Sequence, residues 1–188
     1  MNTLILSLDA YSWVRNCAGI VSRTPDSYQL FVIFRDDMKP MCRCNKICSE
    51  ATYVQRMYDL FKIGKELGVK KVYNMNYCED DPIDIESLIM KLHLSILIGG
   101  AKRIIFEDNN ILKVALLKMC KEAEVELFSY NPICDYKLKD IIYIDLSQKE
   151  IEKKMSLSEH MVGIHNTQEL PSDSNCEVLY KVGGKWLQ

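Results

Sequence analysis

The sequence lacks any long apolar run, and this absence excludes a helix that crosses a bilayer. Such a helix needs about 20 mostly apolar residues, and no stretch of the 188 residues approaches that length. The apolar start, residues 1–8, also lacks the basic segment and the small-residue cleavage site of a signal peptide. We therefore expect a first β-strand there, and no membrane partner.

An excess of charge of one sign is also absent. The 24 Lys and Arg against 26 Asp and Glu give a net charge of -2, so nothing in the charge favours nucleic acid or an anionic membrane as a partner. The pairs Lys70-Lys71 and Lys153-Lys154 are predicted to be solvated. Neither a G-x-G-x-x-G loop nor a P-loop is present, which weakens a nucleotide-binding function.

Eight cysteines occur without an export signal, a combination typical of free thiols in a reducing compartment. We therefore expect a cytoplasmic protein. Cys42, Cys44 and Cys48 lie close together, and Cys78 follows a predicted strand. Four thiolates can bind zinc, but the C-x-C-x3-C spacing is not that of the common zinc sites. Free thiols are the favoured interpretation.

Strand-like and helix-like patterns alternate along the whole chain. Strands are predicted at residues 3–8, 28–34, 69–73, 103–106, 125–130, 141–144 and 177–182, and helices at 13–22, 49–67, 85–99, 111–120 and 147–161. Asp84 is expected to cap the third helix, and Gly68 to end the second. This alternation predicts one domain, 1–188, with a three-layer, doubly wound, Rossmann-like α/β fold: a mainly parallel sheet with helices on both faces.

In such a sheet, ligands bind at the carboxyl ends of the strands, and the residues predicted there are mostly acidic. They are Asp9, Asp36, Asp37, the segment from Tyr77 to Asp81, Glu107 and Asp108. Carboxylates that lie together repel one another unless a cation or a hydroxyl- or amine-bearing ligand lies among them. Helix capping is the alternative for each of them. An all-oxygen site made by Asp9, Glu107 and Asp108 would suit magnesium or calcium better than zinc.

Aromatic residues are predicted at the same edge. Tyr11, Trp13 and Tyr77 either offer a stacking surface to a sugar or a base, or fill the space where a pocket would be. Filling is the favoured interpretation. Of the histidines, His93 is expected to be half-buried on the apolar side of a helix.

Several segments, taken in order, resemble the PIG-L (LmbE-like) N-acetylglucosaminyl deacetylase family. Residues 7–23 match a strand followed by (A/S)-P-H-P-D-D-E and a G-C-G-G helix start, with Cys17 and Gly19 at the family's Cys and second Gly. Residues 58–77 resemble A-x-x-L-G-V-x-x-V-x-F-L-G-Y, and 143–168 resemble V-D-V-S … K … A-L-x-x-H-x-S-Q. Glu177 begins a segment like the family's E-A-F strand.

The resemblance also shows which chemical groups are missing. It implies a zinc-binding His, a general-base Asp and a zinc-binding Asp at the positions of Asp9, Tyr11 and Ser12. Tyr11 is a poor base because the pKa of tyrosine is about 10, and Ser12 is a poor zinc ligand. The family's later H-P-D-H motif is replaced by a direct run from Glu107 into a helix. We therefore expect no zinc cofactor and no family chemistry.

Two functions follow from these observations. The favoured one is a catalytically degenerate deacetylase homologue, a pseudoenzyme that serves as a binding or assembly module. Its expected partners are a sugar- or nucleotide-like ligand, a second copy or another protein. Asp9, Tyr11, Ser12, Asp36, Asp37, Tyr77, Glu107, Asp108 and His165 are the candidate ligand-binding residues. The alternative is an active hydrolase or deacetylase for an N-acetylated sugar or related small molecule, with a non-standard acidic or thiolate site.

Overall fold

Strands and helices alternate along the chain as the apolar periodicity predicts. The computed structural model describes residues 2–8, 12–34, 46–77, 84–130, 137, 140–165 and 176–183, and for some of these, Cys48, Tyr77 and His165 among them, it describes the backbone alone. The strands are β1 (Asn2–Ser7), β2 (Tyr28–Phe34), β3 (Lys71–Tyr77), β4 (Ala101–Glu107), β5 (Glu126–Tyr130), β6 (Ile141–Asp145) and β7 (Cys176–Gly183). The helices are α1 (Ser12–Arg23), α2 (Lys46–Leu67), α3 (Ile85–Gly99), α4 (Asn110–Ala123) and α5 (Gln148–His165). None of these helices is both long and apolar enough to cross a membrane.

The described strands form one sheet in the order β3-β2-β1-β4-β5-β7-β6. Strands β1 to β5 pair in parallel, whereas β7 is antiparallel to both β5 and β6. The chain builds outward from β1 in one direction through β2 and β3, then returns to place β4 on the other side of β1. This makes the carboxyl ends of β1 and β4 the topological switch point, where ligands bind in doubly wound sheets.

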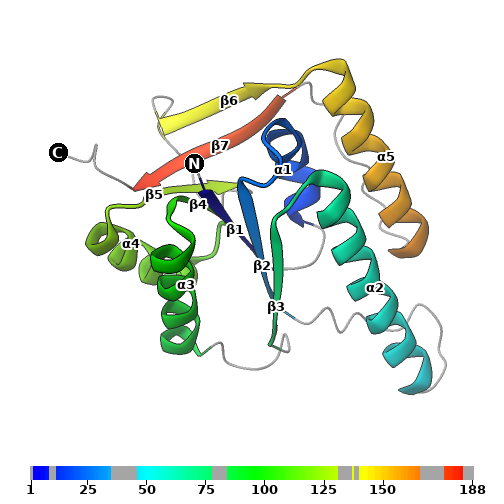
Figure 1. The fold of residues 1–188 in the computed structure, drawn as a ribbon, viewed down its shortest axis with the longest axis horizontal. Coiled ribbons are helices and arrows are strands. Elements are labelled where there is room, and N and C mark those ends of the chain that lie inside the picture. Colours follow the sequence, from blue (N-terminus) through cyan, green and yellow to red (C-terminus); the bar gives the residue numbers. More distant parts are fainter. Residues whose placement is uncertain are drawn as a thin grey trace.

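Helices cover both faces of the sheet, which confirms the predicted three-layer fold (Figure 1). Helices α1, α2 and α5 pack on one face, where Trp13, Leu60 and Leu157 meet the inward side chains of the strands. On the other face, α3 and α4 bury Leu92 and Leu116 against the opposite set of strand residues. Because strand side chains alternate between faces, each central strand contributes to both cores.

Local signals set several of the helix ends. The Asp84 carboxylate accepts a hydrogen bond from the Ser87 amide at 3.0 Å, and Gly100 ends α3 with a φ of 61°. Gly68 ends α2 with a φ of +79°, and a Cβ there would lie 2.7 Å from Pro25. These observations confirm the predicted Asp84 cap and Gly68 stop.

Two predicted boundaries are wrong. Helix α2 begins at Lys46, three residues before the predicted start at residue 49. Strand β3 spans Lys71–Tyr77, so Tyr77 is the last residue of the strand and not part of the loop after it.

A buried carboxylate joins three elements on the α1 face of the sheet. Glu177 of β7 is 2% exposed and accepts hydrogen bonds from the backbone amides of Gly19 and Ile20 in α1, both at 2.8 Å. Lys154 of α5 approaches the same carboxylate at 3.2 Å and is itself buried. Burial raises the pKa of Glu177, while Lys154 and the two amides oppose that rise. The prediction that Lys154 is solvated is therefore wrong. Lys154 is buried because it pairs with the Glu177 carboxylate, which lies far from it in the sequence.

Gly19 permits this close approach. A Cβ at this position would meet the Leu146 side chain, with one methyl carbon 2.9 Å away, and would lie 3.2 Å from the Glu177 carboxyl carbon. Helix α1 can therefore approach β7 and the residue after β6 this closely only without a side chain here. Gly19 and Glu177, two positions at which the sequence resembles the deacetylase family, are in direct contact.

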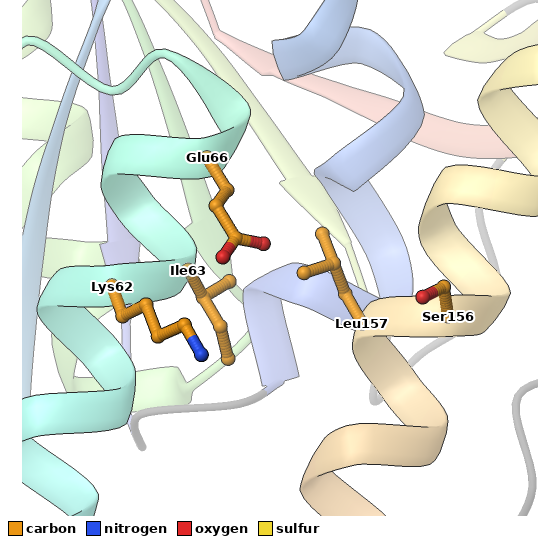
Figure 2. A pocket seen from close by; sticks show the side chains of 5 residues that line it. All are labelled: Lys62, Ile63, Glu66, Ser156 and Leu157. Carbon is orange, nitrogen blue, oxygen red and sulfur yellow. The ribbon is translucent and has the colours of Figure 1, made fainter.

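A small hollow lies on the same side of the sheet between α2 and α5 (Figure 2). It has a volume of about 150 Å³ and is lined by Lys62, Ile63, Glu66, Ser156 and Leu157. Near it, the Lys153 ammonium donates a hydrogen bond to the Glu66 carbonyl oxygen at 2.8 Å, in the last turn of α2. The lining comes from the middle of α5 and the end of α2, so the hollow is separate from the strand-end rim.

Replacing Gly19 by alanine is expected to destabilise the protein by about 1–3 kcal/mol, the usual cost of overpacking. The sign of the change in unfolding free energy tests the contact, because Gly→Ala within a helix otherwise stabilises a protein by roughly 0.5–1 kcal/mol. Urea unfolding followed by circular dichroism measures the change. Adding Leu146→Ala should recover part of the loss, and strictly additive effects of the two substitutions would contradict the contact.

Lys154→Met is expected to cost about 3 kcal/mol, because it leaves the buried Glu177 carboxylate without its cation. Lys153→Met, which removes only the exposed contact to Glu66, is the matched control and should cost less than about 1 kcal/mol.

The loss in Lys154→Met should also depend on pH. Burial raises the pKa of Glu177, so the stability that this group contributes is present below its unfolded pKa of about 4.3 and is lost as pH rises through the folded pKa. Removal of Lys154 raises that folded pKa further. The deficit relative to wild type should therefore be larger at about pH 8 than at about pH 5, and an equal deficit at both would exclude Glu177 as its cause.

Candidate functional site

A direct contact joins the ends of β1 and β4 at the switch point. The Leu8 amide, just after β1, donates a hydrogen bond to the Glu107 carboxylate at 3.1 Å. Glu107 is the last residue of β4, opposite Tyr130 of β5 in the strand register. The Glu107 side chain is therefore near the predicted place, but one of its oxygens binds the chain's own backbone at the point where a ligand would enter.

Tyr130 fills the floor of this switch point. Its side chain is fully buried, and its hydroxyl donates a hydrogen bond to the Ser7 hydroxyl oxygen at 3.0 Å. A second side-chain hydrogen bond joins Tyr130 to Ser12. Burial raises the pKa of Tyr130 well above 10.0, and the negative charge of Glu107 raises it further. The tyrosine is thus a neutral, hydrogen-bonded part of the floor at neutral pH.

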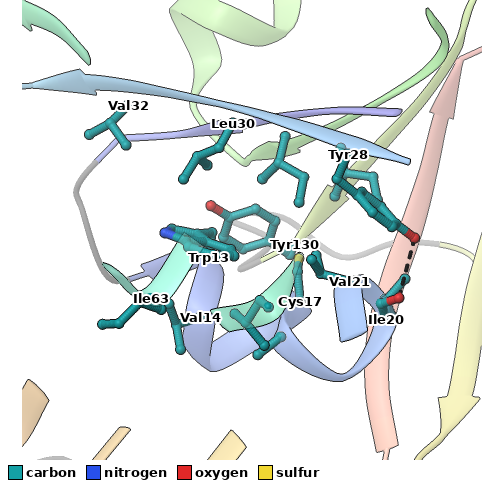
Figure 3. Close-up of a cluster of buried hydrophobic side chains, with 14 of the residues drawn as sticks. Trp13, Val14, Cys17, Ile20, Val21, Tyr28, Leu30, Val32, Ile63 and Tyr130 are labelled. Atoms are coloured by element: carbon teal, nitrogen blue, oxygen red, sulfur yellow. Dashed lines mark hydrogen bonds between the residues drawn. The ribbon is translucent and has the colours of Figure 1, made fainter. Parts of the chain in front are cut away.

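Ser12 and Trp13 place the start of α1 against this floor. Ser12 is the first residue of α1, is 8% exposed, and accepts a hydrogen bond on its carbonyl oxygen from the Asn16 side chain at 2.8 Å. Trp13 is fully buried in the core, beside Tyr130 (Figure 3). Trp13 therefore fills space and offers no exposed stacking surface.

The turn after β4 is too short for an additional metal-binding loop. Only Asp108 and Asn109 separate the end of β4 from the start of α4. The Asn109 side chain accepts a hydrogen bond from the Leu112 amide at 3.3 Å and so caps α4. The Asp108 side chain is buried and lies 3.6 Å from the Lys113 ammonium. The predicted direct run from the fourth strand into a helix is confirmed.

The remaining candidate residues are not placed by the described structure. Asp9, Tyr11, Asp36 and Asp37 lie outside the described residues, as do Cys42, Cys44 and Cys78. Only the backbone is described for Cys48, Tyr77 and His165. The predicted acidic rim and the thiol cluster therefore stay predictions. Cys17, Cys120 and Cys176 are free thiols, and His93 is half-buried as expected.

The residues described at the switch point do not fit a zinc ion. Ser12, at the position that the resemblance aligns with a zinc-binding Asp, is hydrogen-bonded to Tyr130, and a neutral hydroxyl is not among the usual zinc ligands. Within the described part of the chain, no three His, Cys, Asp or Glu side chains converge as a metal site requires. The expectation of no zinc cofactor still depends on Asp9 and the cysteine-rich segment.

Sequence reasoning missed Tyr130, although a signal for it was available. The predicted strand 125–130 ends at this tyrosine, so the rule that placed the acidic residues at the rim also places Tyr130 there. What no strand-end pattern predicts is that its hydroxyl is buried and hydrogen-bonded to Ser7 and Ser12. Its partner Ser7 is the last residue of β1, so the same rule places it at the rim.

Comparison with known proteins shows a likeness in structure. No protein-family model and no curated protein sequence matches the chain. A deacetylase triple mutant involved in teicoplanin biosynthesis has a TM-score of 0.72 and 10% identity, with 100% of each chain covered. The N,N'-diacetylchitobiose deacetylase from Pyrococcus horikoshii has a TM-score of 0.66 and 10% identity, over 95% of this chain and 82% of that one.

A protein named for a different reaction has the same fold. GalB, a 4-carboxy-2-hydroxymuconate hydratase from Pseudomonas putida KT2440, has a TM-score of 0.66 and 11% identity, over 100% of this chain and 99% of its own. At such low identity these likenesses establish the fold and leave the activity open. The chain therefore has the fold of LmbE/PIG-L-type deacetylases, and the resemblance predicted from the sequence is confirmed at that level.

Tyr130→Phe is expected to destabilise the protein by about 1–2 kcal/mol, because it leaves the buried hydroxyls of Ser7 and Ser12 without their shared partner. Tyr28→Phe is the control. It removes a longer hydrogen bond of 3.4 Å to the Ile20 carbonyl oxygen and one with the side chain of Thr24, and it should cost less because Thr24 is exposed and can bind water instead. Urea unfolding measures both. If Tyr130→Phe were neutral, Tyr130 would be an apolar filler whose hydroxyl contributes nothing.

Proposed function

We propose that this protein is a catalytically degenerate relative of the deacetylases that it resembles, a pseudoenzyme retained as a binding or assembly module. The observation that carries the proposal is the contact between Tyr130 and Ser12. The resemblance requires a carboxylate that binds zinc at the position of Ser12. Here that position has a hydroxyl whose hydrogen bond is made inside the protein.

The turn between β4 and α4 supports the same proposal. The resemblance implies a third zinc ligand, and a histidine that assists the tetrahedral intermediate, in a loop after the fourth strand. Two residues separate that strand from the next helix here, and both are engaged locally, with Lys113 and with the Leu112 amide. A metal-assisted hydrolysis needs three ligands and a base around an open position, and two of those ligands and the base are replaced or absent.

The proposed ligand of the module is a sugar- or nucleotide-like small molecule, bound at the strand-end rim. A solved protein of this fold is named for a disaccharide, N,N'-diacetylchitobiose, and carboxylates at such a rim can accept hydrogen bonds from sugar hydroxyls. Asp9, Tyr11, Asp36, Asp37, Tyr77, Glu107 and His165 stay the proposed contact residues. The buried side chains of Ser12 and Asp108 are bonded within the protein. The proposed location of the protein is the cytoplasm.

Metal content and acetate release test the loss of catalysis. Protein purified without a histidine tag is expected to hold well below stoichiometric zinc by elemental analysis. It should release no acetate from N-acetylglucosamine or N,N'-diacetylchitobiose, with or without added zinc, because neither the zinc-binding carboxylate nor the base is present. An active deacetylase of this fold, assayed in parallel, serves as the positive control.

Two substitutions distinguish a true absence of activity from the alternative function. An active enzyme with a non-standard acidic or thiolate site would show turnover that Asp9→Ala or Cys44→Ala abolishes, and that result would refute the proposal. Cooperative thermal unfolding of every sample is required, so that inactivity cannot be attributed to unfolded protein.

A further inference from the structure

Helix α3 is apolar on its solvent side as well as on its buried side. Leu88, Leu92 and Ile96 face the core and are at most 7% exposed. The opposite side has four large apolar side chains in water: Met90 at 64%, Leu94 at 50%, Leu97 at 67% and Ile98 at 83% exposed. We call these four residues the α3 stripe. A helix on the surface of a monomer normally has polar residues there, and one that is apolar all round is normally buried.

Helical spacing places the four side chains of the stripe together. Residues four apart, such as Met90, Leu94 and Ile98, follow one another along one side of a helix, and Leu97 lies beside them. Figure 1 shows α3 on the outside of the fold, next to α4 and away from α1, α2 and α5. Val114 of α4 is a further exposed apolar residue, at 72%. The stripe is therefore one continuous strip on an outer helix.

The area of the stripe suits a second protein surface. A fully exposed side chain of this size offers on the order of 100 Å² of apolar surface, so at the observed exposures the stripe offers on the order of 250 Å². One partner of a standard homodimer interface contributes about 800 Å², of which about two-thirds is apolar. The stripe alone thus supplies about half of that apolar share.

The charges around the stripe favour a partner that carries both signs. Glu86 is exposed in the first turn of α3, while Lys91 is exposed beside the middle of the stripe and Lys102 just beyond the end of the helix. A two-fold contact between antiparallel α3 helices would place the acidic start of each near the basic end of the other. A strongly charged partner such as an anionic membrane would meet Glu86 unfavourably.

We propose that the α3 stripe is the interface of a symmetric homodimer, centred near Leu94. The occupant of the stripe is a second copy of this chain, packed helix against helix. The inference specifies the assembly role within the proposed function, and it does not depend on the loss of catalysis. The stripe lies along the outer helix α3, whereas most of the candidate ligand-binding residues lie at the carboxyl ends of the strands.

Molar mass in solution tests the proposal. Sedimentation equilibrium of the full chain should show a dimer that dissociates on dilution. Leu94→Glu should raise the dissociation constant at least about tenfold, because it places two carboxylates at the centre of an apolar contact. Val54→Glu is the matched control: Val54 is 66% exposed on α2, on the other face of the sheet, and its variant should stay dimeric.

Two variants of opposite charge at residue 94 show whether a loss of dimer comes from the interface or from misfolding. Leu94→Glu and Leu94→Lys should each be mainly monomeric, and an equimolar mixture should form dimers, because in a two-fold contact the same position meets itself. A wild-type protein that is monomeric at all accessible concentrations would overturn the proposal, as would a Leu94→Glu variant that dimerises like wild type. Sedimentation of monomers with anionic phosphatidylserine vesicles would assign the stripe to a membrane instead.

The two proposals fail separately. A monomeric protein without zinc or turnover would overturn the dimer and leave the pseudoenzyme standing. A dimer that releases acetate in an Asp9-dependent manner would do the reverse.

Discussion

The Glu177 carboxylate is the contact on which the geometry of the α1 face depends. It comes from a strand added late in the chain, yet it accepts hydrogen bonds from two amides of the first helix and pairs with a lysine of the last. A buried ion pair contributes little net stability, because desolvation of both charges offsets their attraction. The ion pair instead specifies geometry, because the carboxylate finds all its partners only when α1, α5 and β7 take one mutual arrangement. That arrangement fixes where α1 begins, and so where Ser12 and Trp13 meet the strand ends.

In this chain, structural residues therefore match the deacetylase pattern, whereas a residue at a catalytic position departs from it. Gly19 and Glu177 match the deacetylase pattern and touch each other, and the closeness of that contact leaves no room for a side chain at Gly19. Ser12 departs from the pattern at the rim, where Tyr130 receives its hydrogen bond. A serine in place of the zinc-binding carboxylate leaves no charge unpaired at the rim, because the tyrosine and the two serines are hydrogen-bonded to one another. Substitution in the Glu177 contact would leave a buried charge unpaired.

Much of the fold could be predicted from the sequence because it is encoded locally. Short apolar runs, the Asp84 cap and the Gly68 stop each act within a few residues, and the structure has them. Apart from the two boundaries of α2 and β3, the errors concern contacts between distant segments. Lys154 looks like any lysine beside another lysine, and only β7, more than twenty residues later, explains its burial. Tyr130 ends a predicted strand, but its role depends on Ser7, which is 123 residues away. No local pattern contains that information.

The fold alone does not decide what the protein does, because deacetylases and a hydratase share it at about one-tenth identity. Function in such a scaffold depends on the side chains at the strand ends and on the surfaces left uncovered. At the strand ends, the backbone of Leu8 and the hydroxyls of Ser7 and Ser12 are bound by Glu107 and Tyr130, so the described groups there are turned toward one another. On the outside, α3 leaves in water the kind of surface that a helix normally buries. Among the described residues, the polar groups at the rim are thus bonded to one another, and the apolar surface of α3 faces water. Both observations support the proposed binding or assembly module.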